Sequence, residues 1–245
     1  MPDYLLTNWP YVLLATGAGF AGGLVALIWS PKSRARSAIQ HFAAGAVLAA
    51  VASNVIPEAE RLGTMAGILS GFAAGGLTMI GLKWFVVKWE RREKSKGKLP
   101  VGLATAAAVD TLLDGALIGA GFSAGGRLGA LLTIALAIEL FFLTLSVGAE
   151  FRKGKVGPWQ ALAVTGGIAI LLLVGALGAT FLLEGASEAV IAMVLAFGAA
   201  ALIYLIAEEL LVETIEAEDS LFPTATLFSG FLLLLALKLL SPDNP

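Results

Sequence analysis

Six stretches of at least 18 residues in this sequence contain no charged side chain. A helix needs about 20 apolar residues to cross the roughly 30 Å hydrocarbon core of a membrane. Two further stretches of this kind, at 99–126 and 128–149, are interrupted only by acidic residues. The sequence therefore predicts eight membrane-spanning helices. The uncharged stretches are Tyr4–Pro31, Ala38–Pro57, Leu62–Leu82, Val156–Leu183, Ala189–Ala207 and Ser220–Leu237.

The composition agrees with a polytopic membrane protein of the all-α class. Of the 245 residues 58% are hydrophobic and only 14% are charged, too few charges to cover a water-soluble protein or to bind nucleic acid. The first stretch lacks a basic start and is too long for a cleaved signal peptide. We expect a single transmembrane transporter domain over residues 1–245, with spans at about 9–30, 38–58, 62–87, 99–122, 128–150, 157–183, 188–211 and 221–240.

The positions of the basic residues predict the orientation of the chain. Three alternate connections, at 32–36, 88–98 and 152–155, carry twelve of the 16 Lys and Arg residues. Connections rich in Lys and Arg stay in the cytoplasm. We therefore expect both termini to lie outside an integral membrane protein, in a prokaryotic cytoplasmic (inner) membrane.

A weak internal repeat links two of the expected helices. Asn54 is followed four residues later by Glu58, and Glu209 is followed four residues later by Glu213, each after a run rich in small apolar residues. The two helices run in opposite directions in the expected topology. This is the arrangement of inverted repeats in secondary transporters.

Three carboxylates lie deep within the expected spans. Asp110 lies eleven residues after Leu99, about 16 Å along a helix, and Asp114 follows at i+4 on the same face. Glu139 reaches a similar depth in the next span. Each costs on the order of 2.5–3.5 kcal/mol to insert, so the group indicates either protonated side chains that hydrogen-bond between helices or a cation site.

The residue types limit the chemistry of such a site. The chain has no cysteine, and His41 is its one histidine. An interfacial histidine is most often solvated, with a secondary metal contact as the alternative. Glu208 and Glu209 are as consistent with an interfacial acid pair as with ligands. The candidate neutral oxygens are those of Asn54, Thr111, Thr144 and Ser146.

Three segments resemble motifs of the ZIP (Zrt/Irt-like protein) divalent-metal transporters. The segment from Asp110 to Gly119 resembles the family's His-Asn, two residues, acid-Gly motif. The segment from Asn54 to Ala59 is similar to its His-Leu-Leu-Pro-Glu-Ala, and the segment from Tyr204 to Leu211 is similar to its Tyr…(Asp/Glu)-Glu-Leu-Leu. The resemblance covers nearly the whole chain and suggests a divergent, prokaryotic-type member.

This sequence also departs from the family pattern. Asp110 stands in place of the family's His and Thr111 in place of its Asn. The family's motif in the fifth span is His-Glu, two residues, then Glu-Gly. Here Glu139 takes the first position of that motif, with Leu140 and Leu143 where the two acids are expected and Thr144 at the Gly, or it takes the second position, with Phe142 where the last acid belongs. Both readings leave the family's two-metal centre incomplete. The resemblance therefore implies one site of Asp110, Asp114 and Glu139, with Glu209 and Asn54 as further ligands.

The resemblance implies a secondary transporter that moves divalent cations toward the cytoplasm by alternating access. Spans 1–3 and 6–8 would form inverted repeats around spans 4 and 5, with Glu58 and Glu60 at the outer mouth and Glu213 at the inner one. The all-oxygen ligand set lets Mn²⁺, Fe²⁺ and Mg²⁺ compete with Zn²⁺. The cation is a transported substrate and no prosthetic group is expected.

Two alternatives remain at this point. One is a transport-inactive relative with a structural or regulatory role. The other is an intramembrane aspartyl hydrolase, although two aspartates one turn apart on one helix do not easily flank a substrate bond. The expected partners are a divalent cation and the lipid bilayer, with a homodimer as a candidate assembly.

Overall fold

The computed structural model describes residues 3–93, 101–154, 156–216 and 221–240. Within these ranges only the backbone is described for residues 3–7, 33, 86–87, 89–93, 101 and 209–216. All the regular secondary structure of the described residues is helical. Its elements are α1 (Asp3–Ile28), α2 (Ser33–Ala50), the π-helical turn η1 (Val51–Val55), α3 (Ile56–Leu62), α4 (Met65–Glu93), α5 (Val101–Ala124), α6 (Gly126–Lys153), α7 (Pro158–Leu182), α8 (Glu188–Glu216) and α9 (Leu221–Leu240).

Eight helices of the described chain are long and apolar enough to cross a membrane, as the sequence predicts. The second of them combines α2, η1 and α3 over Arg34–Leu62. It begins before the expected residue 38 because helical hydrogen bonds continue through the polar first turn, where the Arg36 amide donates to the Lys32 carbonyl at 2.9 Å. Apolar runs locate the hydrocarbon part of a helix and not its ends.

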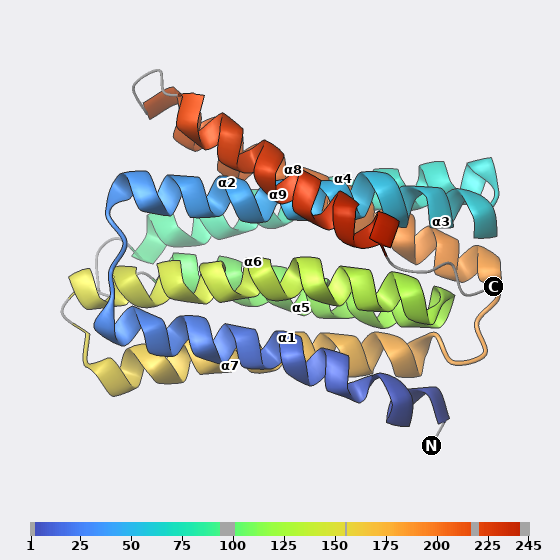
Figure 1. Ribbon diagram of the computed structural model, residues 1–245, viewed down its shortest axis with the longest axis horizontal. Helices are drawn as coiled ribbons and strands as arrows, with labels where there is room; N and C mark the ends of the chain where they lie inside the picture. Colours follow the sequence, from blue (N-terminus) through green and yellow to red (C-terminus); the bar gives the residue numbers. More distant parts are fainter. Residues whose placement is uncertain (1–2, 94–100, 155, 217–220, 241–245) are drawn as a thin grey trace.

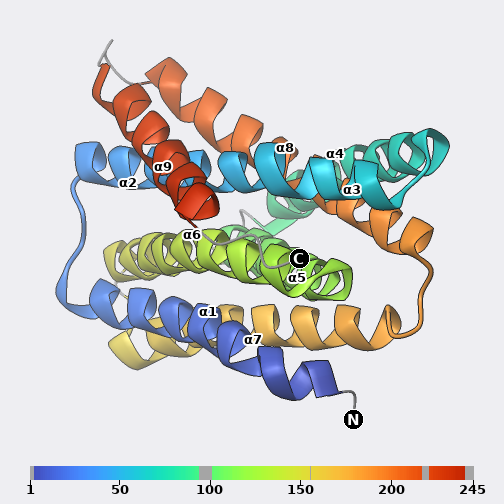
Figure 2. The same ribbon diagram turned by 45° about the vertical axis from the view of Figure 1, so that its right-hand side comes forward.

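Helices α5 and α6 form the middle of the molecule. Figures 1 and 2 show them between α1 and α7 on one side and α2, α4, α8 and α9 on the other. The main packing pairs are α1 with α6, α5 with α7, α2 with α9 and α4 with α8. Side chains that face inward from α5 and α6 are therefore covered by helices on both sides.

Glycines set the close approach of the helix pairs. A Cβ at Gly45 of α2 would clash with the Leu227 carbonyl of α9, and one at Gly230 of α9 would clash with the Phe42 carbonyl of α2. In the same way Gly115 of α5 faces α7. Small residues allow backbones in a membrane to pack this closely. These small residues are thus a packing feature.

The π-helical turn precedes a proline in the second span. Because Pro57 has no N–H, the Ser53 carbonyl lacks its usual α-helical donor. The Lys238 ammonium of α9 donates a hydrogen bond to this carbonyl, and the Lys238 carbonyl in turn accepts one from Arg127 at 2.9 Å. A side chain from another helix therefore stabilises the irregular turn.

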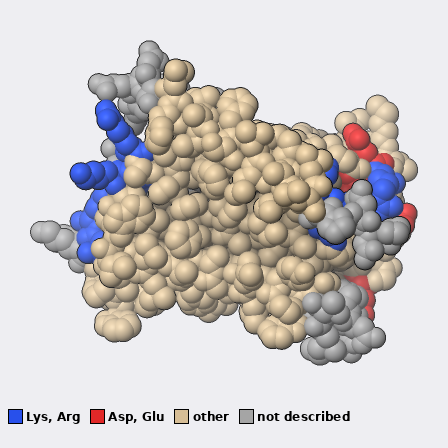
Figure 3. Space-filling model, in the orientation of Figure 1, with Lys and Arg blue, Asp and Glu red and all other residues tan. Residues whose placement is uncertain are grey.

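On the face of the molecule drawn in Figure 3, the described charges gather at the two ends. Figure 3 shows Lys and Arg at one end and a mixture of acidic and basic residues at the other, with an uncharged surface between them. We call the first the basic end; its described members are Lys32, Arg34, Arg36, Lys88, Arg152 and Lys153. The first turn of α1 and the last turn of α9 lie at the opposite end (Figure 1).

Candidate metal centre

Asp110, Asp114 and Glu139 come together between α5 and α6. Each contributes one carboxylate oxygen to a group whose members all lie within 4.8 Å of one another. Asp110 is 7% exposed and Asp114 only 1%, while Glu139 is partly buried. In the described part of the chain this is the one group of three or more metal-ligand side chains.

The helical period explains why α5 can supply two of these carboxylates. Asp110 and Asp114 are one turn apart on one face of α5. Gly115 and Gly119 lie against α7, where an added Cβ would meet the Leu172 and Ala176 carbonyls. One face of α5 is thereby packed against a neighbouring backbone, and the carboxylates turn toward α6 and α8.

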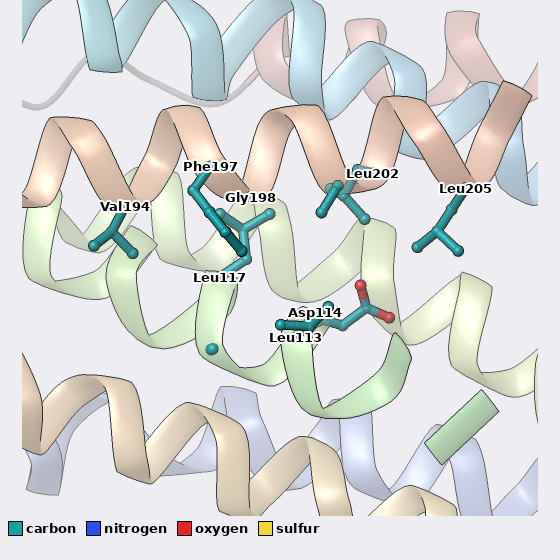
Figure 4. Close-up of a pocket in the computed structure, with 10 residues that line it drawn as sticks. Leu113, Asp114, Leu117, Val194, Phe197, Gly198, Leu202 and Leu205 are labelled. Carbon is teal, nitrogen blue, oxygen red and sulfur yellow. The ribbon is translucent and has the colours of Figure 1, made fainter. Parts of the chain in front are cut away.

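An apolar cavity between α5 and α8 reaches Asp114. Figure 4 shows the Asp114 carboxylate among side chains that include Leu117, Phe197 and Leu202. Among the described residues of this lining, Asp114 is the one that carries a charged group. Leu117 also fills the space that a side chain at Gly198 would occupy. Because α5 runs away from the basic end, this cavity extends from Asp114 toward the opposite end of the molecule.

A second, more polar cavity reaches Asp110 and Glu139 from the other direction. Residues of α2, α5, α6 and α8 line it, and Gln40 and Ser146 add an amide and a hydroxyl. It extends toward the basic end, because α2 begins there and α6 ends there (Figure 1). The three carboxylates therefore lie between two cavities of different polarity.

The orientation of α6 bears on the two registers of the fifth-span motif. Glu139, Phe142 and Leu143 all line the polar cavity, whereas Leu140 is fully buried against Gly19 of α1. A ligand at the position of Leu140 would point away from the other carboxylates. Phe142 and Leu143, the last-acid positions of the two registers, both face this cavity, whereas Leu140 does not line it.

The expected neutral oxygens lie in different surroundings. The Thr144 hydroxyl donates to the Gly19 carbonyl of α1 at 2.8 Å, or to carbonyls of its own helix, and so faces α1. The Asn54 amide lies in η1 and donates to the Ser53 hydroxyl at 3.0 Å. Thr111 is fully buried, and its hydroxyl has no hydrogen-bond partner among the described residues. Ser146 alone of the four lines the polar cavity.

Of the remaining candidate residues, the structure describes the side chains of Glu208 and His41, and neither belongs to the three-carboxylate group. Glu208 forms an ion pair with Lys83 of α4. The side chains of Glu209 and Glu213 lie outside the described residues. His41 is only 5% exposed, and its Nδ1 lies 2.7 Å from the Ser37 carbonyl oxygen. It is therefore buried between helices and is not the solvated interfacial histidine that the sequence favours.

Three features of this region were not singled out in the sequence. Gln40 lies inside an uncharged run and carries no signal of its own. Arg36 counts in the sequence only as a basic residue of a connection, and Glu150 only as an acid at the end of a span. The i, i+4 spacings from Arg36 to Gln40 and from Ser146 to Glu150 place each pair on one helix face, but only the packing of α2 on α6 brings the two faces together.

Comparison with known proteins gives one relative and no matching family model. The chain is similar to the zinc transporter ZIPB of Bordetella bronchiseptica. The two sequences are 29% identical over 249 residues, which cover 93% of this chain and 80% of ZIPB. With the eight apolar helices, the similarity to ZIPB identifies an integral membrane protein, and it points to a transporter rather than an enzyme. It gives no support to the homodimer.

Proposed function

We propose that this protein is a divergent prokaryotic-type ZIP transporter that carries divalent metal cations through the Asp110–Asp114–Glu139 group. The observation that carries the proposal is the convergence of three carboxylates within 4.8 Å in the middle of an apolar bundle. The ZIP motifs fall on the same residues, and the similarity to ZIPB extends over 93% of the chain.

Electrostatics favours a bound cation over three carboxylates that face one another without it. Like charges at this separation, buried among helices, repel and resist ionisation. A divalent cation offsets that repulsion and holds all three groups ionised. Protons compete with the cation for the same oxygens, so binding should weaken as the pH falls.

Alternating access would use the two cavities in turn. The packing pairs support inverted repeats. Spans 1–8 are, in order, α1, α2 with η1 and α3, α4, α5, α6, α7, α8 and α9. If spans 1–3 are exchanged with spans 6–8, and span 4 with span 5, the α1–α6 pair becomes the α7–α5 pair and the α2–α9 pair becomes the α8–α4 pair. A transporter built this way opens by moving one set of helices against another around a central site.

The ligand set bears on the choice of metal and the topology on its direction. Carboxylate oxygens without imidazole suit harder ions, so we propose Mn²⁺ and Fe²⁺ as substrates beside Zn²⁺. The basic connections favour the cytoplasm for the basic end, and an inner membrane with both termini outside. In this orientation the metal moves from the apolar cavity to the polar one, toward the cytoplasm.

The proposal is tested by metal uptake into proteoliposomes that contain the purified protein. Wild type should accumulate Zn²⁺ or Mn²⁺ above protein-free vesicles. Asp114→Asn should lower the uptake rate by about a hundredfold or more, because the loss of one ion–carboxylate contact in a buried site costs about 3 kcal/mol. Asn is neutral, so membrane insertion should not suffer.

The matched control is Glu184→Gln, the same change of a carboxylate to an amide at an exposed residue between α7 and α8. It should transport like wild type. Wild-type uptake by Asp114→Asn would leave the carboxylates as interhelical hydrogen-bonding groups. An inactive wild type would instead support the structural or regulatory alternative.

A further inference from the structure

The polar cavity continues along two helix faces toward the basic end. One turn before Gln40 on α2 lies Arg36, and one turn after Ser146 on α6 lies Glu150. The Arg36 Nη1 donates to the Glu150 Oε1 at 2.6 Å. The first pair of side chains beyond the cavity is thus an ion pair between α2 and α6.

This ion pair is partly buried and lies between two helices that contact each other. The Arg36 side chain is 19% exposed and that of Glu150 is 30% exposed. The Glu150 carboxylate also accepts a hydrogen bond from Lys153 at 2.8 Å, but Lys153 belongs to the same helix. Among the described residues, Arg36 is therefore the partner of Glu150 that lies on α2.

In this arrangement part of the Arg36 guanidinium lacks hydrogen-bond partners among the described residues. Arg36 Nε and Nη2 are buried, and neither has a hydrogen-bond partner among the described residues. Buried donors without partners cost free energy, which offsets part of the gain from the ion pair. The pair is consequently suited to separate when the helices move.

We propose that the Arg36–Glu150 ion pair closes the basic end of the polar cavity and must separate before a cation can pass between the Asp110–Glu139 region and that side of the membrane. The inference rests on the proposed transport function for its purpose. The closure itself is a property of the cavity and can be tested without metal.

The test measures how fast a positively charged methanethiosulfonate reagent modifies a single cysteine at Ser146. Because the chain has no cysteine of its own, Ser146→Cys provides the only thiol. Permeabilised membranes expose both ends to the reagent, so the result does not depend on orientation. In this background Arg36→Gln and Glu150→Gln should each accelerate labelling by roughly fivefold, as expected for loss of a partly buried pair.

Three further variants separate the closure from a general loosening of the helices. The double variant should label no faster than either single one, because both changes break the same contact. Lys153→Gln removes the other partner of Glu150 and should leave labelling within about twofold of the parent. Arg36→Lys keeps the charge and should stay slow, which also covers the case in which Arg36→Gln does not fold.

Unchanged labelling in Arg36→Gln and Glu150→Gln would overturn the closure. Equal acceleration by Lys153→Gln would overturn it as well, since that change leaves the α2–α6 contact in place. Metal uptake by the wild-type protein is measured in the separate proteoliposome experiment. If labelling responds as expected but no metal is transported, the closure stands and the proposed function fails.

Discussion

The two cavities that reach the carboxylates differ in what closes them. On the apolar side, between α5 and α8, Leu117 packs over Gly198 with Phe197 beside it. On the polar side Gln40 and Ser146 line the space and the Arg36–Glu150 pair lies beyond them. Apolar packing excludes water and ions whatever the salt concentration, whereas an ion pair competes with solution ions. A cation would thus meet a dry barrier on one side and an electrostatic one on the other.

Among the changes that compare the two cavities, the largest loss of uptake is expected from filling the apolar cavity. In Gly198→Val the new side chain occupies the space of Leu117 and displaces it toward Asp114. Uptake should fall by about tenfold or more, in line with the cost of overpacking. Binding of the metal to the detergent-solubilised protein should be preserved, since the substitution leaves the polar cavity that reaches Asp110 unchanged.

Gly167→Val is the matched control for this change. No atom lies within 4 Å of a Cβ added at Gly167, so the same substitution meets open space on α7. Equal losses of uptake in both variants would show that valine harms the helices in general and would remove the distinction between the cavities.

An intermediate effect is expected from changing the ligand on the polar side. Asp110→His introduces an imidazole beside Asp114 and Glu139. Imidazole favours Zn²⁺ over Mn²⁺ more than a carboxylate does, so the preference should shift toward Zn²⁺ by roughly tenfold, equal to about 1.4 kcal/mol. Competition between the two ions for the purified protein measures the shift. An unchanged preference would mean that Asp110 does not contact the metal.

The number of metal ions bound should depend on the apolar residues of α6 beside Glu139. Phe142 and Leu143 line the cavity where further carboxylates would be needed to bridge two ions. We expect one tightly bound metal per chain, with an affinity that falls as the carboxylates are protonated at lower pH. Metal analysis of the purified protein after gel filtration, at neutral and at acidic pH, measures both. Two ions per chain would contradict this prediction.

The smallest effect is expected from salt. Raising the ionic strength shortens the screening length from about 10 Å at 0.1 M to about 3 Å at 1 M. Labelling of Ser146→Cys should rise by roughly twofold, because the Arg36–Glu150 pair is weakened. Labelling of Ala201→Cys, in the apolar cavity, should not change. A rise at both positions would show that salt loosens the bundle as a whole.

The sequence predicted the helices well because the helix is the one stable conformation of a long apolar run in a membrane. A backbone without water must satisfy its own hydrogen bonds, which a helix does within itself. For the same reason Asp110 and Asp114 could be placed on one face from their spacing alone. The helix ends were less well predicted, as at Ser33, because polar turns outside the hydrocarbon remain helical.

The contacts between helices could not be predicted from the sequence in this way. Glu208 was a reasonable candidate ligand by depth, but its ion pair with Lys83 depends on the packing of α4 against α8. The Thr144 hydroxyl was a candidate neutral oxygen until its contact with the Gly19 carbonyl turned it toward α1. Both residues meet partners more than a hundred positions away along the chain.

The sequence by itself thus determined the number of spans, the charge at their ends and the presence of three deep carboxylates. Only the tertiary structure decided that Asp110, Asp114 and Glu139 meet, that Glu139 shares a cavity wall with Phe142, and that Arg36 reaches Glu150. The physical reason is the range of the interactions. Hydrophobicity and helical period act along one segment, whereas the rotation of each helix about its axis is set by close contacts such as those of Gly45 and Gly115 with neighbouring backbones.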